Sequence, residues 1–199
     1  NYSNFVLSFN DKSLYDDMFF WFKDTTMMIE EYNVVHKPIN ILPKNMPYKN
    51  YINIYYDNLS NELTKFGLYS YNVKKWVFED KNKKGVIKSK ISSGGIYAVL
   101  TEDISPLVSN IIPAKGSTYR TKDLKEIIFN FSDELSGLNH HKTKIRIDGE
   151  NYFFDAIKYR KMIRANINNQ LKKGKHIIEI YVEDNLGNFT DITYEFFTK

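Results

Sequence analysis

The chain of 199 residues is 42% hydrophobic and 16% aromatic, so it can fill a core and is not a disordered tail. Its 28 basic and 24 acidic residues give a net charge of +4, which is too weak and too dispersed for a nucleic-acid-binding surface, and no nucleic-acid-binding motif accompanies it. The absence of cysteine excludes disulfides and thiolate metal sites, and no apolar run approaches the roughly 20 residues that span a bilayer.

The first half of the chain reads as a series of short strands. Runs of aromatic and β-branched residues, which favour strands, recur between turn signals such as Ser93-Gly94-Gly95. These runs cover residues 5–9, 18–22, 33–35, 52–56, 67–72, 76–79, 86–91 and 96–100. The run at 18–22 is ambiguous because Leu14, Met18 and Phe22 also have helical spacing, but its aromatic residues favour a strand.

A domain boundary is predicted where the first half ends. The apolar run at 96–100 is followed by the short polar segment 101–106, in which Pro106 imposes an extended conformation on the residue before it. We therefore predict two tandem β-sandwich domains of about 100 residues each, covering residues 1–102 and 103–199. No helix of ordinary length is predicted in either domain.

The second half shows the period-two alternation of strands more clearly. Its runs at 127–131, 176–182 and 190–196 place apolar residues on one face and polar residues on the other. The dipeptide Asp148-Gly149 between 144–147 and 152–154 is a strong hairpin signal, because both residues tolerate positive φ angles. With further strands at 108–112 and around Ile157 and Ile163, about seven strands are expected, as in an immunoglobulin-like or fibronectin-like sandwich.

An ordered series of motifs marks the second half. The series is Asp133-x-x-Ser136-Gly137-Leu138, Ile147-Asp148-Gly149, Gly174-Lys175-His176 and Val182-x-Asp184-Asn185-x-Gly187-Asn188. It resembles the immunoglobulin-like domain at the C-terminus of many bacterial envelope metallopeptidases of the lysostaphin-like (M-twenty-three) family. The junction in that family, tyrosine-alanine-valine, an aspartate and a proline, is matched by Tyr97-Ala98-Val99, Asp103 and Pro106, although Ser105 stands where a second proline is usual.

The first half resembles the β-sandwich that precedes that domain in the same family, and is also similar to the spectrin-binding sandwich of ankyrins. The matching segments are 6–9, Leu14-Tyr15, Leu42-Pro43, Gly67-Leu68-Tyr69, Trp76 and 95–99. Some relatives of that sandwich cleave themselves at a His-x-Ser/Thr site near its last strand. This chain has Ser92-Ser93-Gly94-Gly95 there and no histidine, so self-cleavage is not expected.

The sequence assigns no catalytic, cofactor-binding or metal-binding residue. The lysostaphin-like peptidases bind zinc through His-x-x-x-Asp and His-x-His, and neither motif occurs here. In a strand, the adjacent pair His140-His141 would point to opposite faces, which is poor geometry for one metal. A Ser-His-Asp triad is not excluded by spacing, but no nucleophile elbow or phosphate loop is present. The chain is therefore predicted not to be an enzyme.

Two weaker readings concern ligands. The acidic turns at Asp133 and Asp184 can bind calcium, but we favour the interpretation that they hold their own backbone turns. Trp21 and Trp76 are candidates for stacking on a sugar ring, but we favour packing in the core for both. Tyr55 and Tyr56, beside Asp57 and Asn58, are better candidates for an exposed aromatic patch.

The leading functional expectation is a non-catalytic accessory region of a secreted, periplasmic or cell-envelope protein. Because the chain begins at Asn1 and not at Met, we expect a fragment or a processed chain that has lost a targeting segment. The resemblance implies as partner a peptidase catalytic domain in the same parent chain, or a cell-wall polymer, with no nucleic acid and no membrane span. The alternatives are a carbohydrate-binding or adhesion module, and a subunit of a surface assembly that pairs through an open sheet edge.

Overall fold

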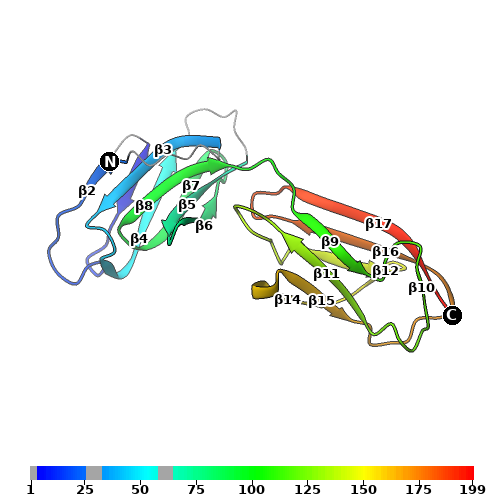
Figure 1. Ribbon diagram of the computed structural model, residues 1–199. Coiled ribbons are helices and arrows are strands. Elements are labelled where there is room, and N and C mark those ends of the chain that lie inside the picture. Colours follow the sequence, from blue (N-terminus) through cyan, green and yellow to red (C-terminus); the bar gives the residue numbers. More distant parts are fainter. Residues whose placement is uncertain (1–3, 26–32, 58–64) are drawn as a thin grey trace. The chain divides into compact units, whose positions relative to one another are not determined.

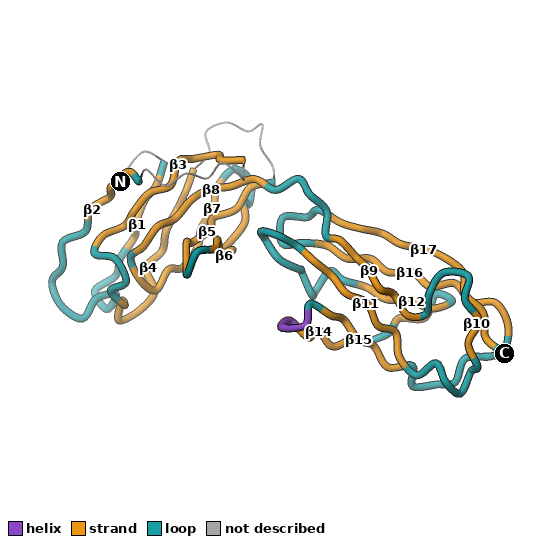
Figure 2. The backbone as a smooth tube through the Cα atoms, in the orientation of Figure 1, coloured by secondary structure: helices purple, strands orange, loops and turns teal. Residues whose placement is uncertain are grey.

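The computed structural model describes residues 4–25, 33–57 and 65–199 (Figures 1 and 2). The chain divides into two compact units, Asn1–Asp103 and Ile104–Lys199. Regular structure in the described residues is β, apart from one 3-10 turn at Lys158–Arg160 that follows β14 (Figure 2). No helix among them is long and apolar enough to cross a membrane.

The first unit consists of two antiparallel sheets. One has the strand order β1-β4-β7 and the other β2-β3-β8-β5-β6. Their bounds are β1 Phe5–Ser8, β2 Trp21–Asp24, β3 Asn33–Leu42, β4 Pro47–Asp57, β5 Phe66–Asn72, β6 Lys75–Lys81, β7 Val86–Ser93 and β8 Gly95–Thr101.

Alternation along the strands builds the core of the first unit. In β7 the side chains of Ile87, Ser89 and Ile91 are buried, while the residues between them are exposed. In β4 the inward face carries Ile52, Ile54 and Tyr56. These faces pack against buried residues of the other sheet, such as Ile39 and Val99 in β3 and β8. The unit is therefore a β-sandwich with one apolar interior.

The strand predicted at 18–22 is wrong in its first three residues. Pairing with β3 begins only at Trp21, which lies opposite Leu42. The preceding residues carry the chain from the sheet that contains β1 to the sheet that contains β2. Phe20 is held there by aromatic contacts, with ring centroids 4.8 Å from Phe9 and 5.7 Å from Tyr48. Its apolar character therefore serves the crossing between sheets and not strand pairing.

Gly94 marks a close approach of two backbone segments in the first unit. It forms a parallel bridge with Lys44, and its carbonyl accepts a hydrogen bond from the amide of Asn45 at 3.1 Å. A Cβ at Gly94 would overlap the carbonyl oxygen of Pro43 and lie 2.7 Å from that of Ile41. Only a residue without a side chain fits this position.

The second unit also has two sheets. Their strand orders are β14-β15-β11-β9 and β10-β17-β16-β12-β13. The bounds are β9 Leu107–Ile112, β10 Thr118–Tyr119, β11 Glu126–Ser132, β12 Lys144–Ile147, β13 Glu150–Asn151, β14 Phe154–Ile157, β15 Met162–Asn166, β16 Gly174–Glu183 and β17 Phe189–Thr198. The four strands β9, β11, β15 and β14, and the central trio β12, β16 and β17, reproduce the order of the two immunoglobulin sheets. The protein is therefore all-β, with a sandwich in each unit.

The interior of the second unit follows the predicted period. His176, Ile178, Ile180 and Val182 of β16 are all buried. They face buried residues of the opposite sheet, among them Ile127, Phe129 and Ile163. The alternation predicted for 176–182 is thus confirmed.

The hairpin predicted at Asp148-Gly149 forms, but its second strand is shorter than expected. Asp148 and Gly149 have φ angles of 52° and 82°, as a two-residue hairpin turn requires. Only two residue pairs follow, Arg146 with Asn151 and Ile147 with Glu150. The chain then leaves this sheet through residues 152–153 and enters the other sheet as β14. The expected strand at 152–154 is therefore largely a crossing between sheets.

Candidate functional site

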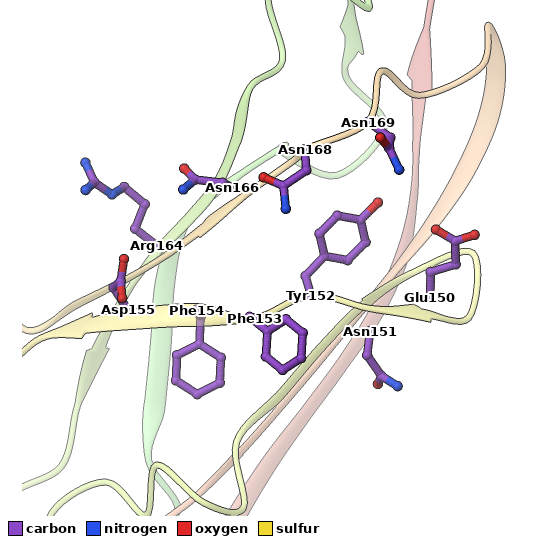
Figure 3. A pocket seen from close by; sticks show the side chains of 10 residues that line it. All are labelled: Glu150, Asn151, Tyr152, Phe153, Phe154, Asp155, Arg164, Asn166, Asn168 and Asn169. Carbon is purple, nitrogen blue, oxygen red and sulfur yellow. The ribbon is translucent and has the colours of Figure 1, made fainter.

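The crossing between β13 and β14 forms one wall of an open groove, which we call the crossover groove. Its first pocket, of about 370 Å³, lies between residues 150–155 and a second segment at the end of β15 (Figure 3). That segment contributes Arg164, Asn166, Asn168 and Asn169. Both β13 and β14 are edge strands, so the groove lies on an open side of the sandwich.

Tyr152 is the central side chain of the groove. Its amide donates a hydrogen bond to the carbonyl of Ile145 at 2.9 Å, which fixes the backbone where it leaves the hairpin. The half-buried ring points from its own segment toward Asn168 and Asn169 (Figure 3). Burial raises the pKa of Tyr152, and the nearby carboxylates of Glu150 and Asp148 raise it further. The phenol is therefore neutral at physiological pH and can both donate and accept a hydrogen bond.

Phe153 and Phe154 differ in the burial of their side chains. Phe154 packs against the core of the second unit, whereas the side chain of Phe153 is 97% exposed. A phenyl ring held in water by an ordered backbone has no packing role in the unit that presents it. It provides an exposed apolar ring at the edge of the groove, on the other side of its segment from Asn166, Asn168 and Asn169 (Figure 3).

Charges in the first pocket nearly balance. Asp155 of β14 lies opposite Arg164 of β15 in the strand register. The Arg164 guanidinium also faces Glu126, with Nη1 3.8 Å from Oε1, a contact too long and too exposed to contribute much. With Glu150, the pocket carries two acidic groups and one basic group.

A second pocket of about 340 Å³ continues the groove and shares Glu150, Tyr152 and Asn169 with the first. Its other walls are the hairpin turn at Ile147-Asp148 and the segment 170–172, and His176 lies at its base. The two pockets therefore meet at Tyr152.

His176 ties the two walls of this second pocket together. Nδ1 of its ring lies 2.7 Å from Oδ2 of Asp148, and Nε2 lies 2.8 Å from the carbonyl oxygen of Lys172. The ring is 5% exposed and stacks on Phe196, with centroids 5.2 Å apart. A histidine bonded to both walls holds the width of the groove.

Asp148, His176 and Thr198 also come together in the manner of a hydrolase triad. Oγ1 of Thr198 lies 3.0 Å from Nε2 of His176. The hydroxyl of Thr198, however, donates to the carbonyl of Lys172 at 2.6 Å and is buried with its residue. Its proton is directed away from the imidazole, so the cluster acts in this structure as a clasp for the 170–172 segment. No sequence motif marks this cluster, because its members lie far apart along the chain.

The acidic turns at Asp133 and Asp184 lie close together, with carboxylate oxygens within 4.8 Å of one another. Oδ1 of Asp184 accepts hydrogen bonds from the amides of Gly187 and Asn188, at 2.6 and 2.8 Å. Oδ1 of Asp133 accepts from the amides of Leu135 and Gly137. Each carboxylate thus closes its own turn, as the favoured interpretation predicts. Burial raises the pKa of Asp133, assisted by the charge of Asp184.

Two of the predicted aromatic positions are wrong. The side chain of Trp21 is 53% exposed, because it lies on the edge strand β2, so core packing does not hold for it. Tyr56 is 2% exposed because it shares the inward face of β4, and only Tyr55 points outward, where Lys88 lies 5.3 Å from its ring. Trp76 is half-buried beside Tyr71, and Asn58 lies outside the described residues.

His140 and His141 do not have the strand geometry that was considered for them from the sequence. They lie in a turn and not in a strand. Burial lowers the pKa of His140, and the charges of Lys158 and His141 lower it further.

The fold and the groove together define a tandem β-sandwich protein with an open groove in its second unit. The sequence matches no protein-family model and no curated protein significantly. The expected link to lysostaphin-like peptidases therefore receives no support from these comparisons.

Distant structural matches exist among solved proteins. CopC from Methylosinus trichosporium OB3b has 14% identity and a TM-score of 0.39, and the match covers 47% of this chain and 93% of CopC. The endo-beta-1,4-mannanase from Thermotoga petrophila has 12% identity and a TM-score of 0.39, over 49% and 20% of the two chains. The fibronectin(III)-like modules of CbhA from Clostridium thermocellum have 18% identity and a TM-score of 0.36, over 75% and 86%. At this distance the likeness concerns the fold alone and carries no argument about function.

Proposed function

We propose that this chain is a non-catalytic accessory region of a secreted or cell-envelope protein, and that its second unit binds a polymer along the crossover groove. The observation that carries the proposal is the groove itself, which is open, continuous over two pockets and lined by exposed aromatic, amide and charged side chains. Pockets that bind small ligands have volumes of about 300–1,000 Å³, and each of these pockets lies near the lower end of that range.

The walls of the groove are supported in a way that suits binding. The hairpin wall is fixed by the bond between Tyr152 and Ile145, and the opposite wall by the bonds of His176 and Thr198 to Lys172. A groove held in shape before the ligand arrives loses less conformational entropy on binding. This rigidity favours a preformed site over a segment that folds around its partner.

The peptidase setting is a finer part of the proposal. Its support is the ordered series of motifs from Asp133 to Asn188 and the junction that ends at Pro106. In that setting the chain positions a catalytic domain of the same parent chain against the cell-wall polymer. The sequence of the full-length parent protein tests it, because the setting requires His-x-x-x-Asp and His-x-His motifs before Asn1.

Cosedimentation with purified, insoluble bacterial cell wall tests the binding function. We expect the chain to pellet with the wall, and a variant with Phe153→Ala and Asn168→Ala to stay in the supernatant. Tyr159→Ala is the matched control, because Tyr159 is an 83% exposed aromatic residue of the same unit that lines neither pocket. Equal pelleting of all three proteins, or of none, would contradict the proposal.

A further inference from the structure

We propose that the crossover groove binds an uncharged oligosaccharide in two consecutive subsites, one on each side of Tyr152. This inference rests on the proposed binding function and specifies its ligand. It follows from the connection between the two pockets, from the chemistry of each and from their charge.

The connection sets the minimum length of the ligand. The pockets share Glu150, Tyr152 and Asn169 in their linings, so they adjoin at these residues. A ligand that fills one pocket can continue into the other along the line of residues 166–172. A linear polymer of at least two units fits this arrangement better than a single compact molecule.

The chemistry of the first pocket matches a sugar ring. A pyranose has an apolar face of C–H groups and an edge of hydroxyls that both donate and accept hydrogen bonds. Tyr152, whose ring points toward Asn168 and Asn169, provides an aromatic face for the first, and the exposed ring of Phe153 adds apolar surface at the edge of the groove. Asn166, Asn168 and Asn169 are all exposed, and each amide provides a donor and an acceptor for the second.

The second pocket repeats the polar part of this pattern. Gln170 is exposed, and because its amide nitrogen donates to Oγ1 of Thr121, its carbonyl oxygen is the group that a ligand can reach. The neutral phenol of Tyr152 lines both pockets. Asp148 is already bonded to His176 and to the amide of Ile177, so its carboxylate is satisfied within the protein. Fewer apolar groups are exposed here, so this subsite contributes mainly through hydrogen bonds.

The charges of the groove favour an uncharged ligand. Among the residues that line the two pockets, the acidic groups Asp148, Glu150 and Asp155 outnumber the basic groups Arg164 and Lys172. The basic run that begins at Lys172 continues outside this lining, where Lys175 pairs with Glu195 at 3.0 Å. A strongly anionic polymer would meet a slightly negative groove and would be repelled. The amides remain the dominant polar groups, and amides recognise hydroxyls without requiring charge.

Isothermal titration calorimetry of the whole chain tests the inference with oligomers of β-1,4-linked glucose, mannose and N-acetylglucosamine, from monomer to tetramer, and with tetragalacturonate as the anionic counterpart. We expect one uncharged series to bind with an affinity that rises about tenfold from monomer to trimer and then levels off, and tetragalacturonate to bind more weakly. Phe153→Ala is expected to weaken the trimer about tenfold, whereas Tyr159→Ala changes it less than about twofold. Gln170→Ala is expected to weaken the trimer and to leave the monomer unchanged.

Failure of the inference can be separated from failure of the proposed function. If none of the uncharged series binds, or if tetragalacturonate binds more tightly, the inference is wrong. If wall pelleting still depends on Phe153 in that case, the proposed function stands with another ligand. If pelleting is also independent of Phe153, both are wrong. Because Phe153 is almost fully exposed, its truncation leaves the core intact, and amide spectra of the variants check this directly.

Discussion

Oδ2 of Asp148 lies 2.7 Å from Nδ1 of His176, and this contact joins the β12–β13 turn to strand β16. The other carboxylate oxygen of Asp148 accepts a hydrogen bond from the amide of Ile177 at 2.8 Å. On its far side the imidazole reaches the carbonyl of Lys172. One buried histidine therefore connects the core of the second unit to both walls of its groove.

Replacement of His176 by alanine should destabilise the second unit by about 2–4 kcal/mol, because it removes a buried ring and leaves its hydrogen-bond partners unsatisfied. Both tryptophans lie in the first unit, so their fluorescence does not report this change. Hydrogen exchange of the β16 amides in the whole chain measures it. His141→Ala, at an exposed turn position, should change the same amides by less than about 0.5 kcal/mol. Equal protection of the β16 amides from hydrogen exchange in both variants would show that His176 does not hold the walls of the groove.

Gly94→Ala should destabilise the first unit by about 2–3 kcal/mol, because the new methyl group overlaps the backbone of Pro43. Gly95→Ala is a close control, because a Cβ there meets only the Tyr97 side chain, at 3.9 Å. Its effect should stay below about 1 kcal/mol. Urea unfolding followed by tryptophan fluorescence distinguishes the two. A smaller effect at Gly94 than at Gly95 would be incompatible with the close approach.

The pH dependence of the second unit should carry a contribution from Asp133. Its pKa is raised in the folded chain above the ordinary value of 3.8, mainly by burial. The folded state therefore holds this proton more tightly than the unfolded chain does, and the contribution of Asp133 to stability falls as the pH rises from 3.8 through the raised pKa. Hydrogen exchange of β11 and β16 at a series of pH values should show this loss, and Asp133→Asn should abolish it.

At neutral pH, Asp133→Asn should stabilise the second unit by about 1 kcal/mol, because it removes a charge that burial and then the repulsion from Asp184 disfavour, and it retains an oxygen for the turn. Glu134→Gln, at an exposed position beside it, is the comparison and should have a smaller effect in the same direction, because the Glu134 charge is the smallest contribution to the raised pKa of Asp133. A calcium titration tests the alternative that the two turns bind a cation. If calcium raises the melting temperature of the wild-type chain and Asp133→Asn removes that rise, the two turns form a cation site and not merely a pair of closed turns.

The sequence predicted the strands of the second unit well because their faces alternate. Ile178, Ile180 and Val182 are buried as their spacing indicates, and Asp148-Gly149 forms the expected turn. The same logic, applied to Ile52 and Ile54, would have placed Tyr56 inside. The exposure of Trp21 could not be predicted, because it depends on which strand becomes a sheet edge.

The crossover groove could not be predicted from the sequence for a related reason. The pattern of residues 152–154 predicts a continuous strand. Only the strand order of the two sheets shows that the chain crosses from one sheet to the other at this point. Asn166, Asn168 and Asn169 then meet Tyr152 through tertiary structure alone. Three asparagines within residues 166–169 are the only signal in the sequence, and without the fold they indicate a loop.

The most direct measurement of the central claim is the map of amide shifts when the labelled whole chain is titrated with soluble glycan fragments released from bacterial cell wall. We predict that the shifts concentrate in residues 150–155 and 164–172, which form the two walls of the crossover groove. Shifts confined to the first unit, for example around the exposed Phe19 and Trp21, would contradict the assignment of the site. An unchanged spectrum at saturating fragment would contradict the binding function itself.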